Sequence, residues 1–108
     1  MFDHIKPVRI SSRAAEEILR IFRSKKIPAE YGLRLGVRGA GCGVTPIIGF
    51  DKSRPSDLTY QDQGITIHID KRHTMHLIGK EVDFYEGADA KGFMFVDKAT
   101  TELTTPAA

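Results

Sequence analysis

The stretch Leu33-Arg34-Leu35-Gly36-Val37-Arg38-Gly39-Ala40-Gly41-Cys42-Gly43 changes from a strand pattern to a glycine-rich loop that carries the only cysteine of the chain. Its first six residues alternate apolar and polar side chains, as a half-buried β-strand does. Three glycines then stand at alternate positions, which is typical of backbone that takes positive φ or that lets another group approach closely. The stretch therefore predicts a thiol, that of Cys42, displayed on a loop at the end of a strand.

An amphipathic helix is predicted before this strand. Ser11 or Ser12 can cap its start, because a serine hydroxyl accepts a hydrogen bond from a backbone N–H that has no partner within the helix. Pro28 marks the end of the segment, so we expect a helix of about 12–15 residues. Its apolar stripe has the spacing i, i+3, i+4 and i+7 and consists of Ala15, Ile18, Leu19 and Phe22, widened by Ala14 and Ile21.

Short strands follow the glycine loop. Pro46–Asp51 is a second strand that can pair back on the first, and Ile65–Ile69 shows a clear alternation of apolar and polar residues. Asp70 can cap a short helical turn that Gly79 ends. Residues 92–96 are apolar on both faces, which is typical of a central strand. The remaining predicted strands are Leu58–Gln61 and Glu81–Glu86, with a loop over residues 87–92.

At 108 residues the chain is long enough for one domain with a single modest core. One helix, many short strands and one inserted helical turn predict a mainly β domain of the α+β class. We place the domain at residues 1–97. Residues 98–108 are rich in threonine and alanine, and we expect them to form a frayed tail.

The composition excludes several classes of protein. Hydrophobic residues make up 41% and charged residues 28%, and the net charge of +2 is too small to indicate a nucleic-acid partner. No apolar run approaches the ~18–20 residues that cross a bilayer, so no membrane contact is expected. The N-terminus lacks the pattern of a signal peptide, which makes the cytoplasm the expected location. A single cysteine excludes an internal disulfide.

The chemistry of the loop leaves three kinds of role to consider. Nucleotide binding is disfavoured, because the spacing of Gly39, Gly41 and Gly43 matches neither phosphate-binding pattern and no helix follows. A nucleophilic role for Cys42 would require a base, such as His73 or His76, and an oxyanion site. Metal binding or redox chemistry suits a thiolate better, although a cluster or a tetrahedral site requires four ligands.

The other candidate side chains are less informative. His73 and His76 are three residues apart and can share a helix face as a metal-binding pair, but such pairs are usually solvated surface residues. Asp83 and Glu86 have no partner pattern that indicates acid–base work. The aromatic residues Phe84, Phe93 and Phe95 are expected in the core. From the residues alone, the chain is a small domain that presents one thiol.

Six segments, in order along the chain, together resemble a known family. They are Val8-Arg9-Ile10-Ser11 with Ala14-Ala15, Leu33-Arg34-Leu35-Gly36-Val37 leading to Gly41-Cys42, Gly64-Ile65 through Asp70, Leu77-Ile78-Gly79, Val82-Asp83-Phe84, and Gly92-Phe93-Met94-Phe95. Over roughly residues 8–97 this set resembles the A-type iron–sulfur carrier family, the HesB/IscA-like proteins. The resemblance implies a compact β-sandwich or barrel of short mixed strands, with an opening strand before the helix.

The family resemblance also implies a function. Such proteins bind iron or a 2Fe–2S or 4Fe–4S cluster at subunit interfaces of dimers or tetramers, and they pass it to apo-proteins. The family uses one cysteine in the glycine loop and two in a C-terminal Cys-Gly-Cys-Gly run. Only the first cysteine carries over, to Cys42, with Gly41 and Gly43 beside it. Residues 99–104, where the family has its cysteine pair, contain no sulfur. After Cys42, Gly43-Val44 replaces the usual Ser-Gly.

Three hypotheses follow for the function. The leading one is a non-enzymatic iron–sulfur assembly or carrier protein, with Cys42 as metal ligand in a homodimer or higher homo-oligomer. The second, from the missing tail cysteines, is an interaction module that kept the fold without metal binding. The third is a redox-sensing thiol protein.

Overall fold

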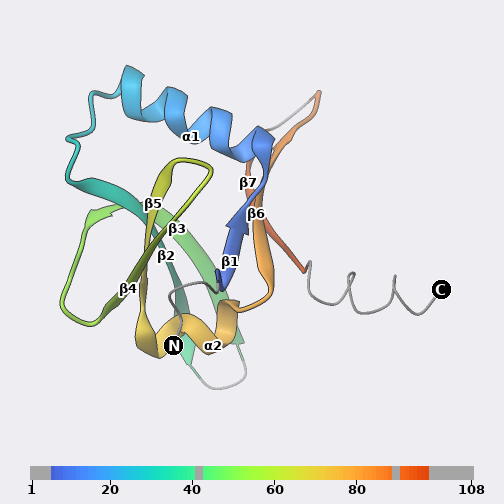
Figure 1. Ribbon diagram of the computed structural model, residues 1–108. Helices are drawn as coiled ribbons and strands as arrows, with labels where there is room; N and C mark the ends of the chain where they lie inside the picture. The colour runs from blue at the N-terminus through green and yellow to red at the C-terminus, as the bar shows by residue number, and fades with distance from the viewer. Residues whose placement is uncertain (1–5, 41–42, 89–90, 98–108) are drawn as a thin grey trace.

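The computed structural model describes residues 6–40, 43–88 and 91–97. The elements run from an N-terminal strand and helix through two hairpins and a short helical insert to a C-terminal hairpin (Figure 1). Their bounds are β1 Val8–Ile10, α1 Ser12–Ser24, β2 Tyr31–Ala40, β3 Gly43–Lys52, β4 Asp57–Asp62, β5 Ile65–Asp70, η1 Lys71–His73, α2 Thr74–Leu77, β6 Lys80–Glu86 and β7 Lys91–Asp97. The predicted tail at residues 98–108 lies outside the described residues.

Helix α1 forms where the periodicity predicts it. Ser11 is its N-cap, and its hydroxyl oxygen accepts a hydrogen bond from the N–H of Ala14 at 3.1 Å. The helix has 13 residues and ends at Ser24, four residues before Pro28. Its buried face is narrower than the predicted stripe, because Leu19 is 38% exposed. Ala14, Ala15 and Ile18 are the buried members.

The larger sheet has the strand order β3-β2-β5-β4. β2 and β3 form a long antiparallel hairpin whose pairing begins at Tyr31 and Lys52, so β3 is longer than its predicted range at both ends. Pro46 is tolerated in β3 because β3 lies at the edge of this sheet. β2 and β5 pair in parallel over a short register from Leu33–Ile67 to Leu35–Ile69, and β4 returns antiparallel to β5.

The smaller sheet has the order β1-β6-β7, and here one prediction is wrong. β7 contains the apolar residues 92–96 but is the edge strand, whereas β6 is central. The apolar side chains of β7 are divided between two faces. Phe93 packs edge-to-face on Phe84 of β6 with ring centroids 5.0 Å apart, while Met94 points the other way and is 38% exposed. An apolar run is typical of a central strand when other elements cover both faces of the sheet, whereas here the face of Met94 stays partly exposed and β7 pairs with β6 alone.

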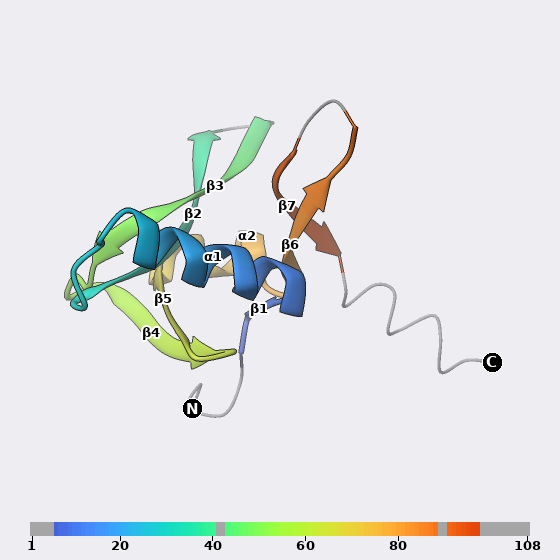
Figure 2. The ribbon, with the colours of Figure 1, turned by 90° about the horizontal axis from the view of Figure 1, so that it is seen from above.

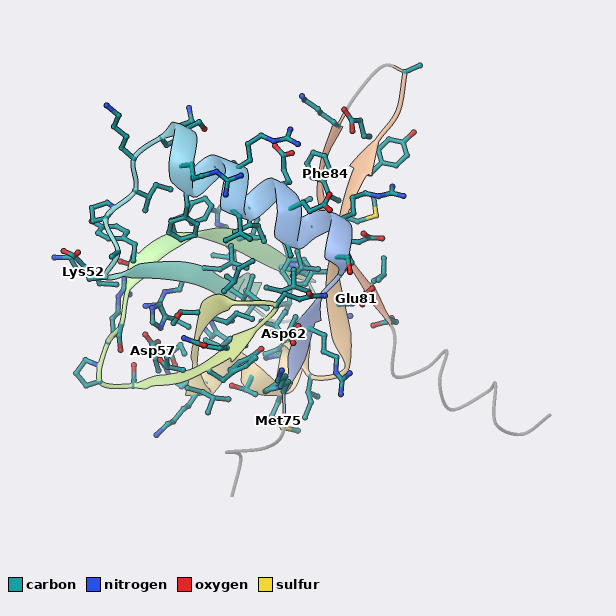
Figure 3. All side chains as sticks on the ribbon, turned by 45° about the horizontal axis from the view of Figure 1, so that its top comes forward. Lys52, Asp57, Asp62, Met75, Glu81 and Phe84 are labelled. Atoms are coloured by element: carbon teal, nitrogen blue, oxygen red, sulfur yellow. The ribbon has the colours of Figure 1, made fainter. Side chains whose placement is uncertain are left out.

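Side chains from the larger sheet join the two sheets. β1 pairs with β6 on one side, and its other edge faces β4. The hydroxyl of Tyr60 donates to the carbonyl oxygen of Val8 at 2.6 Å and accepts from the N–H of Val8 at 3.1 Å. Asp62 accepts from the N–H of Ile10 at 2.8 Å. Figure 3 shows Asp62 at the β1 side of the larger sheet. The side chains of β4 thus satisfy backbone groups that a strand ladder would otherwise satisfy.

One hydrophobic core is formed by side chains of α1 and of both sheets. Figure 2 shows α1 lying across the strands of the two sheets. The predicted mainly β α+β architecture is confirmed, and within the described residues the strands form two sheets without closing into a barrel. Asp70 caps η1 by accepting from the N–H of Arg72 at 2.9 Å, and Gly79 follows α2 with φ +88°, as predicted for the short helical insert. No helix among the described residues has the length and apolar character that crossing a membrane requires.

Candidate functional site

The hairpin of β2 and β3 carries the predicted site. Its ladder continues without a break to the pair Ala40–Gly43. Gly41 and Cys42 connect this last pair, and both lie outside the described residues. Gly43, the third predicted site residue, is the first residue of β3 and is exposed. The described structure therefore defines the hairpin that leads to the thiol.

Gly39 and Gly43 differ in how strongly the backbone requires a glycine. Gly39 has φ +106°, and a Cβ added there would lie 2.3 Å from the carbonyl oxygen of Gly43. No heavy atom lies within 4 Å of the position that a Cβ would take at Gly43. Of these two described glycines, Gly39 fits the prediction of positive φ and close approach and Gly43 does not.

The end of the hairpin has few possible metal ligands beside it. Figure 2 shows the paired ends of β2 and β3 standing clear of α1. Arg38, Val44 and Thr45 at this end are exposed, and none has a thiol, imidazole or carboxylate. Within residues 6–40, 43–88 and 91–97 there is no group of three or more His, Cys, Asp or Glu side chains arranged to hold a metal ion.

The two histidines of the helical insert have different surroundings. The ring of His73 packs on β2, where a Cβ at Gly36 would lie 2.9 Å from its Nδ1 atom. That Nδ1 accepts the N–H of Val37 at 3.4 Å, a weak bond that occupies the nitrogen's lone pair. His76 is exposed on α2. His73 thus packs η1, the turn that follows β5, against β2, which is a structural role.

Asp83 stabilises the start of α1. Its carboxylate accepts the hydroxyl of Ser11 at 2.7 Å and the N–H of Phe84 at 2.8 Å. Ser11 in turn caps α1, so Asp83 holds the helix start against β6. Phe84 is 7% exposed and belongs to the core, while Phe93 and Phe95 pack against the core as half-buried residues.

A polar cluster on the outer face of the larger sheet was not foreseen from the sequence. The guanidinium of Arg34 binds both carboxylate oxygens of Asp57, and its Nη2 also donates to the carbonyl of Lys52 at 2.8 Å. Burial alone would raise the pKa of Asp57, but the hydrogen bonds from Arg34 and from the N–H of Arg54 outweigh it and lower that pKa. Figure 3 shows Asp57 and Lys52 at the same end of the sheet.

His68 lies beside this cluster and is 3% exposed. The alternation in β5 correctly placed it on the face opposite Ile67 and Ile69, but did not indicate that this face is covered. Its Nδ1 is 3.0 Å from the hydroxyl of Thr59, and its Nε2 is buried without a hydrogen-bond partner among the described residues. Burial, and then the charge of Arg34, lower the pKa of His68.

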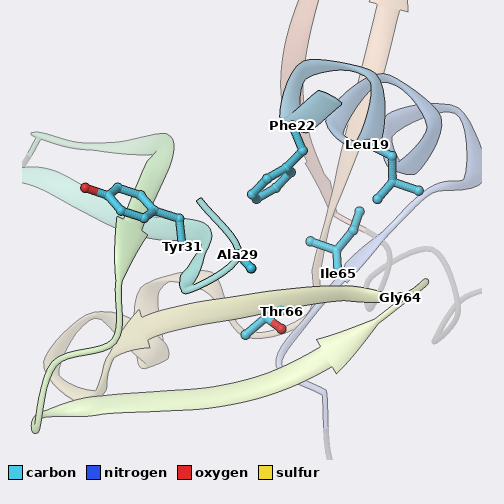
Figure 4. Close-up of a pocket in the computed structure, with 7 residues that line it drawn as sticks. All are labelled: Leu19, Phe22, Ala29, Tyr31, Gly64, Ile65 and Thr66. Atoms are coloured by element: carbon cyan, nitrogen blue, oxygen red, sulfur yellow. The ribbon is translucent and has the colours of Figure 1, made fainter. Parts of the chain in front are cut away.

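A shallow pocket of about 180 Å³ opens between the C-terminal half of α1 and the start of β5 (Figure 4). Tyr31 and Thr66 are its only lining residues with a polar side chain, and Figure 4 shows the Tyr31 hydroxyl directed away from the other lining residues. None of the lining residues is charged or carries sulfur. The remaining lining residues are Leu19, Phe22, Ala29, Gly64 and Ile65. This pocket does not have the donor set of an iron site.

No protein-family model matches the sequence. A curated relative does match: the iron-binding protein IscA of Yersinia enterocolitica is 33% identical over 90 residues, which cover 82% of each chain. The chain belongs to the IscA family. This is the A-type carrier family that the ordered segments resemble, so the predicted membership is confirmed.

Solved structures of this family have the same fold. Escherichia coli SufA, involved in the biosynthesis of iron–sulfur clusters, superimposes with a TM-score of 0.70 and 25% identity, covering 83% of this chain and 79% of SufA. A crystal structure of IscA with a 2Fe–2S cluster gives a TM-score of 0.64 and 26% identity, covering 83% of this chain and 84% of IscA.

Proposed function

We propose that the chain serves in iron–sulfur cluster assembly as a carrier that binds iron or a cluster through Cys42. Family membership with an iron-binding relative over 82% of both chains is the observation that carries this proposal. Thiolates are the usual protein ligands of iron–sulfur clusters. Cys42 is the only cysteine of the chain, and it stands between two strands whose pairing continues to the adjacent residues.

The ligand count requires more than one chain. A cluster is usually held by four cysteine thiolates, and one chain supplies one. We propose that two copies place their Cys42 thiolates at a shared site in a homodimer or a larger homo-oligomer. Oxygen or nitrogen ligands, or an exogenous thiol such as glutathione, then complete the shell. The backbone N–H groups of Gly41 and Gly43, which flank Cys42 in the sequence, are candidates for hydrogen bonds that stabilise the sulfur charge.

The proposed work is transfer and not catalysis. A carrier accepts its cargo and releases it to an apo-protein by exchange of ligands at the iron, without making or breaking a bond in an organic substrate. Weak and incomplete ligation by a single thiolate per chain suits release to a client that offers a full set of thiolates. We place this function in the cytoplasm, with apo-proteins or other assembly proteins as partners.

Anaerobic reconstitution with ferrous iron and sulfide, with and without glutathione, tests the proposal. Iron per chain, absorption and Mössbauer spectra are measured on each fraction separated by size. The expected result is one cluster per two chains in an oligomeric fraction, lost in Cys42→Ser and kept in Thr45→Ala, an exposed change in the same hairpin. Absence of iron from every wild-type fraction would overturn the carrier role.

The single cysteine also favours a second candidate, an interaction module without metal. A pull-down under reducing conditions separates the two, since partners that Cys42→Ser retains do not depend on a bound metal. A third candidate, a redox-sensing thiol, requires a thiol with a lowered pKa. A measured pKa of Cys42 near the free value of about 8.5 would count against it.

A further inference from the structure

Arg34 of β2 and His68 of β5 are direct partners in the parallel register of the larger sheet. Their backbone neighbours Leu33, Leu35 and Ile67 are buried in the core, so by alternation both side chains lie on the opposite face of the sheet. Like charges directly opposite each other on one face destabilise a sheet. Arginine is always charged, so Arg34 supplies one cation on this face. A protonated His68 would add a second cation directly opposite it.

Arg34 cannot turn away from His68 without losing its own contacts. Its guanidinium binds both oxygens of Asp57, whose side chain is 0% exposed, and it also donates to the carbonyl of Lys52. Its Nε lies 3.4 Å from the carboxylate of Asp51. Asp57 is thus bound by Arg34, and Asp51 is bound more closely by Arg54, at 2.6 Å, so both acidic groups that face this region already pair with an arginine.

His68 is placed to be neutral. One ring nitrogen meets Thr59, and the other, Nε2, is buried without a partner among the described residues. Gly32 of β2 leaves room for the ring, since a Cβ there would lie 2.8 Å from Nε2 and 2.7 Å from the carbonyl oxygen of Thr66. A charged imidazolium donates from both nitrogens, and here the second N–H would face the backbone of β2 without an acceptor.

We propose that Arg34 and His68 form a proton-sensitive latch between β2 and β5. The parallel register joins these strands through only three residue pairs, and Arg34–His68 is the middle one. With His68 neutral, β2 and β5 stay paired over these three residue pairs. When the ring takes up a proton, two cations face each other in the middle of that short register and the strands separate more readily. β2 carries the hairpin that leads to Cys42, so the latch couples acidity to the attachment of that hairpin.

The sign of the pH dependence follows from linkage. The pKa of His68 in the folded protein lies below the value of about 6.5 that an unfolded histidine has. Between these two values the unfolded state binds more protons, so stability falls as the pH is lowered through about 6.5 and levels off below the folded pKa. Asp51 and Asp57 oppose this shift, while burial and Arg34 cause it.

The test compares the wild type with His68→Asn, which can keep a polar group near Thr59 but does not titrate. Hydrogen exchange of β2 and β5 amides, corrected for the intrinsic effect of pH, and urea unfolding are measured from pH 7.5 to 5.5. We expect the wild type to lose protection and folded population relative to His68→Asn, by about tenfold for each unit between the unfolded and folded pKa of His68. The exposed control His76→Asn should behave as the wild type.

An NMR titration of the His68 ring in the wild type decides the question even where His68→Asn fails to fold. A pKa below that of free histidine, with β2 and β5 amides responding in the same pH range, supports the latch. A ring that titrates at or above the free value overturns it. The same holds if the wild type and His68→Asn lose equal protection on acidification.

Discussion

Gly39 of β2 lies diagonally across the hairpin ladder from Gly43 of β3, and a Cβ on Gly39 would lie 2.3 Å from the carbonyl oxygen of Gly43. The contact lies beside the Cys42 loop, since Gly43 is the first described residue after it and Gly39 precedes Ala40, the last described residue before it. It sets how the two strands enter that loop, because Gly39 also has the positive φ of +106° that residues with a side chain avoid. The geometry of this pair leads to the first prediction.

Gly39→Ala should disturb the hairpin, while Gly43→Ala should not. At Gly39 the new methyl group meets backbone and strains φ, for which we expect a loss of at least about 1–2 kcal/mol in the free energy of unfolding. At Gly43 the methyl group meets no atom within 4 Å, so a change below about 0.5 kcal/mol is expected. Urea unfolding and hydrogen exchange over residues 31–52 measure both. Equal effects of the two substitutions would contradict this account.

Gly32→Ala should destabilise the larger sheet. The added methyl group would lie 2.7 Å from the carbonyl oxygen of Thr66, which is backbone and cannot move cheaply. Overpacking of this kind typically costs about 1–3 kcal/mol. The matched control is Gly49→Ala in β3, where a Cβ has nothing within 4 Å. Thermal unfolding followed by circular dichroism should show a lowered Tm for Gly32→Ala and little change for the control.

Arg34→Lys should be far more costly than Arg54→Lys. Lysine cannot reproduce the two-pronged contact of Arg34 with Asp57 together with the bond to Lys52, and the carboxylate of Asp57 is fully buried. We expect a loss of about 1–3 kcal/mol in the free energy of unfolding. The ion pair of Arg54 with Asp51 is exposed on the arginine side and should change stability by less than about 1 kcal/mol. Urea titration at pH 7 compares the two variants.

Acid should remove the stability that Asp57 contributes. Its folded pKa is lowered, so the contribution is present above the unfolded value of about 3.9 and is lost as the pH falls toward the folded pKa. The difference in unfolding free energy between the wild type and Asp57→Asn should therefore shrink from pH 5 to pH 2. A difference that stays constant over this range would contradict the lowered pKa of Asp57 in the folded protein.

Tyr60→Phe should weaken the junction between the two sheets. The substitution leaves the N–H and the carbonyl of Val8, a residue with 0% exposure, without the hydroxyl that bonds them. Unpaired buried polar groups cost about 1–3 kcal/mol. Tyr85→Phe is the matched control, since Tyr85 is 51% exposed. Faster hydrogen exchange at β1 in Tyr60→Phe alone is the expected signature.

Local features of the fold were predictable from the sequence. The apolar period and Ser11 indicated α1, the alternation from Ile65 to Ile69 indicated β5, and Asp70 with Gly79 bounded the helical insert. Each of these signals depends on residues a few positions apart. The loop glycines marked the hairpin for the same reason, although of the two described ones, Gly39 and Gly43, it is Gly39 that requires glycine on the grounds that were predicted.

The pairings between distant segments were decided only by the tertiary structure. The edge position of β7, the contact of Tyr60 with Val8 across 52 residues, and the burial of His68 against Gly32 all depend on which strands become neighbours. Periodicity reports which side chains share a face of a strand, but it contains no information about what covers that face. The sequence by itself determined the helix, the strands from β2 onward and the single thiol Cys42, whereas the buried histidine opposite Arg34 exists only because β5 pairs in parallel with β2.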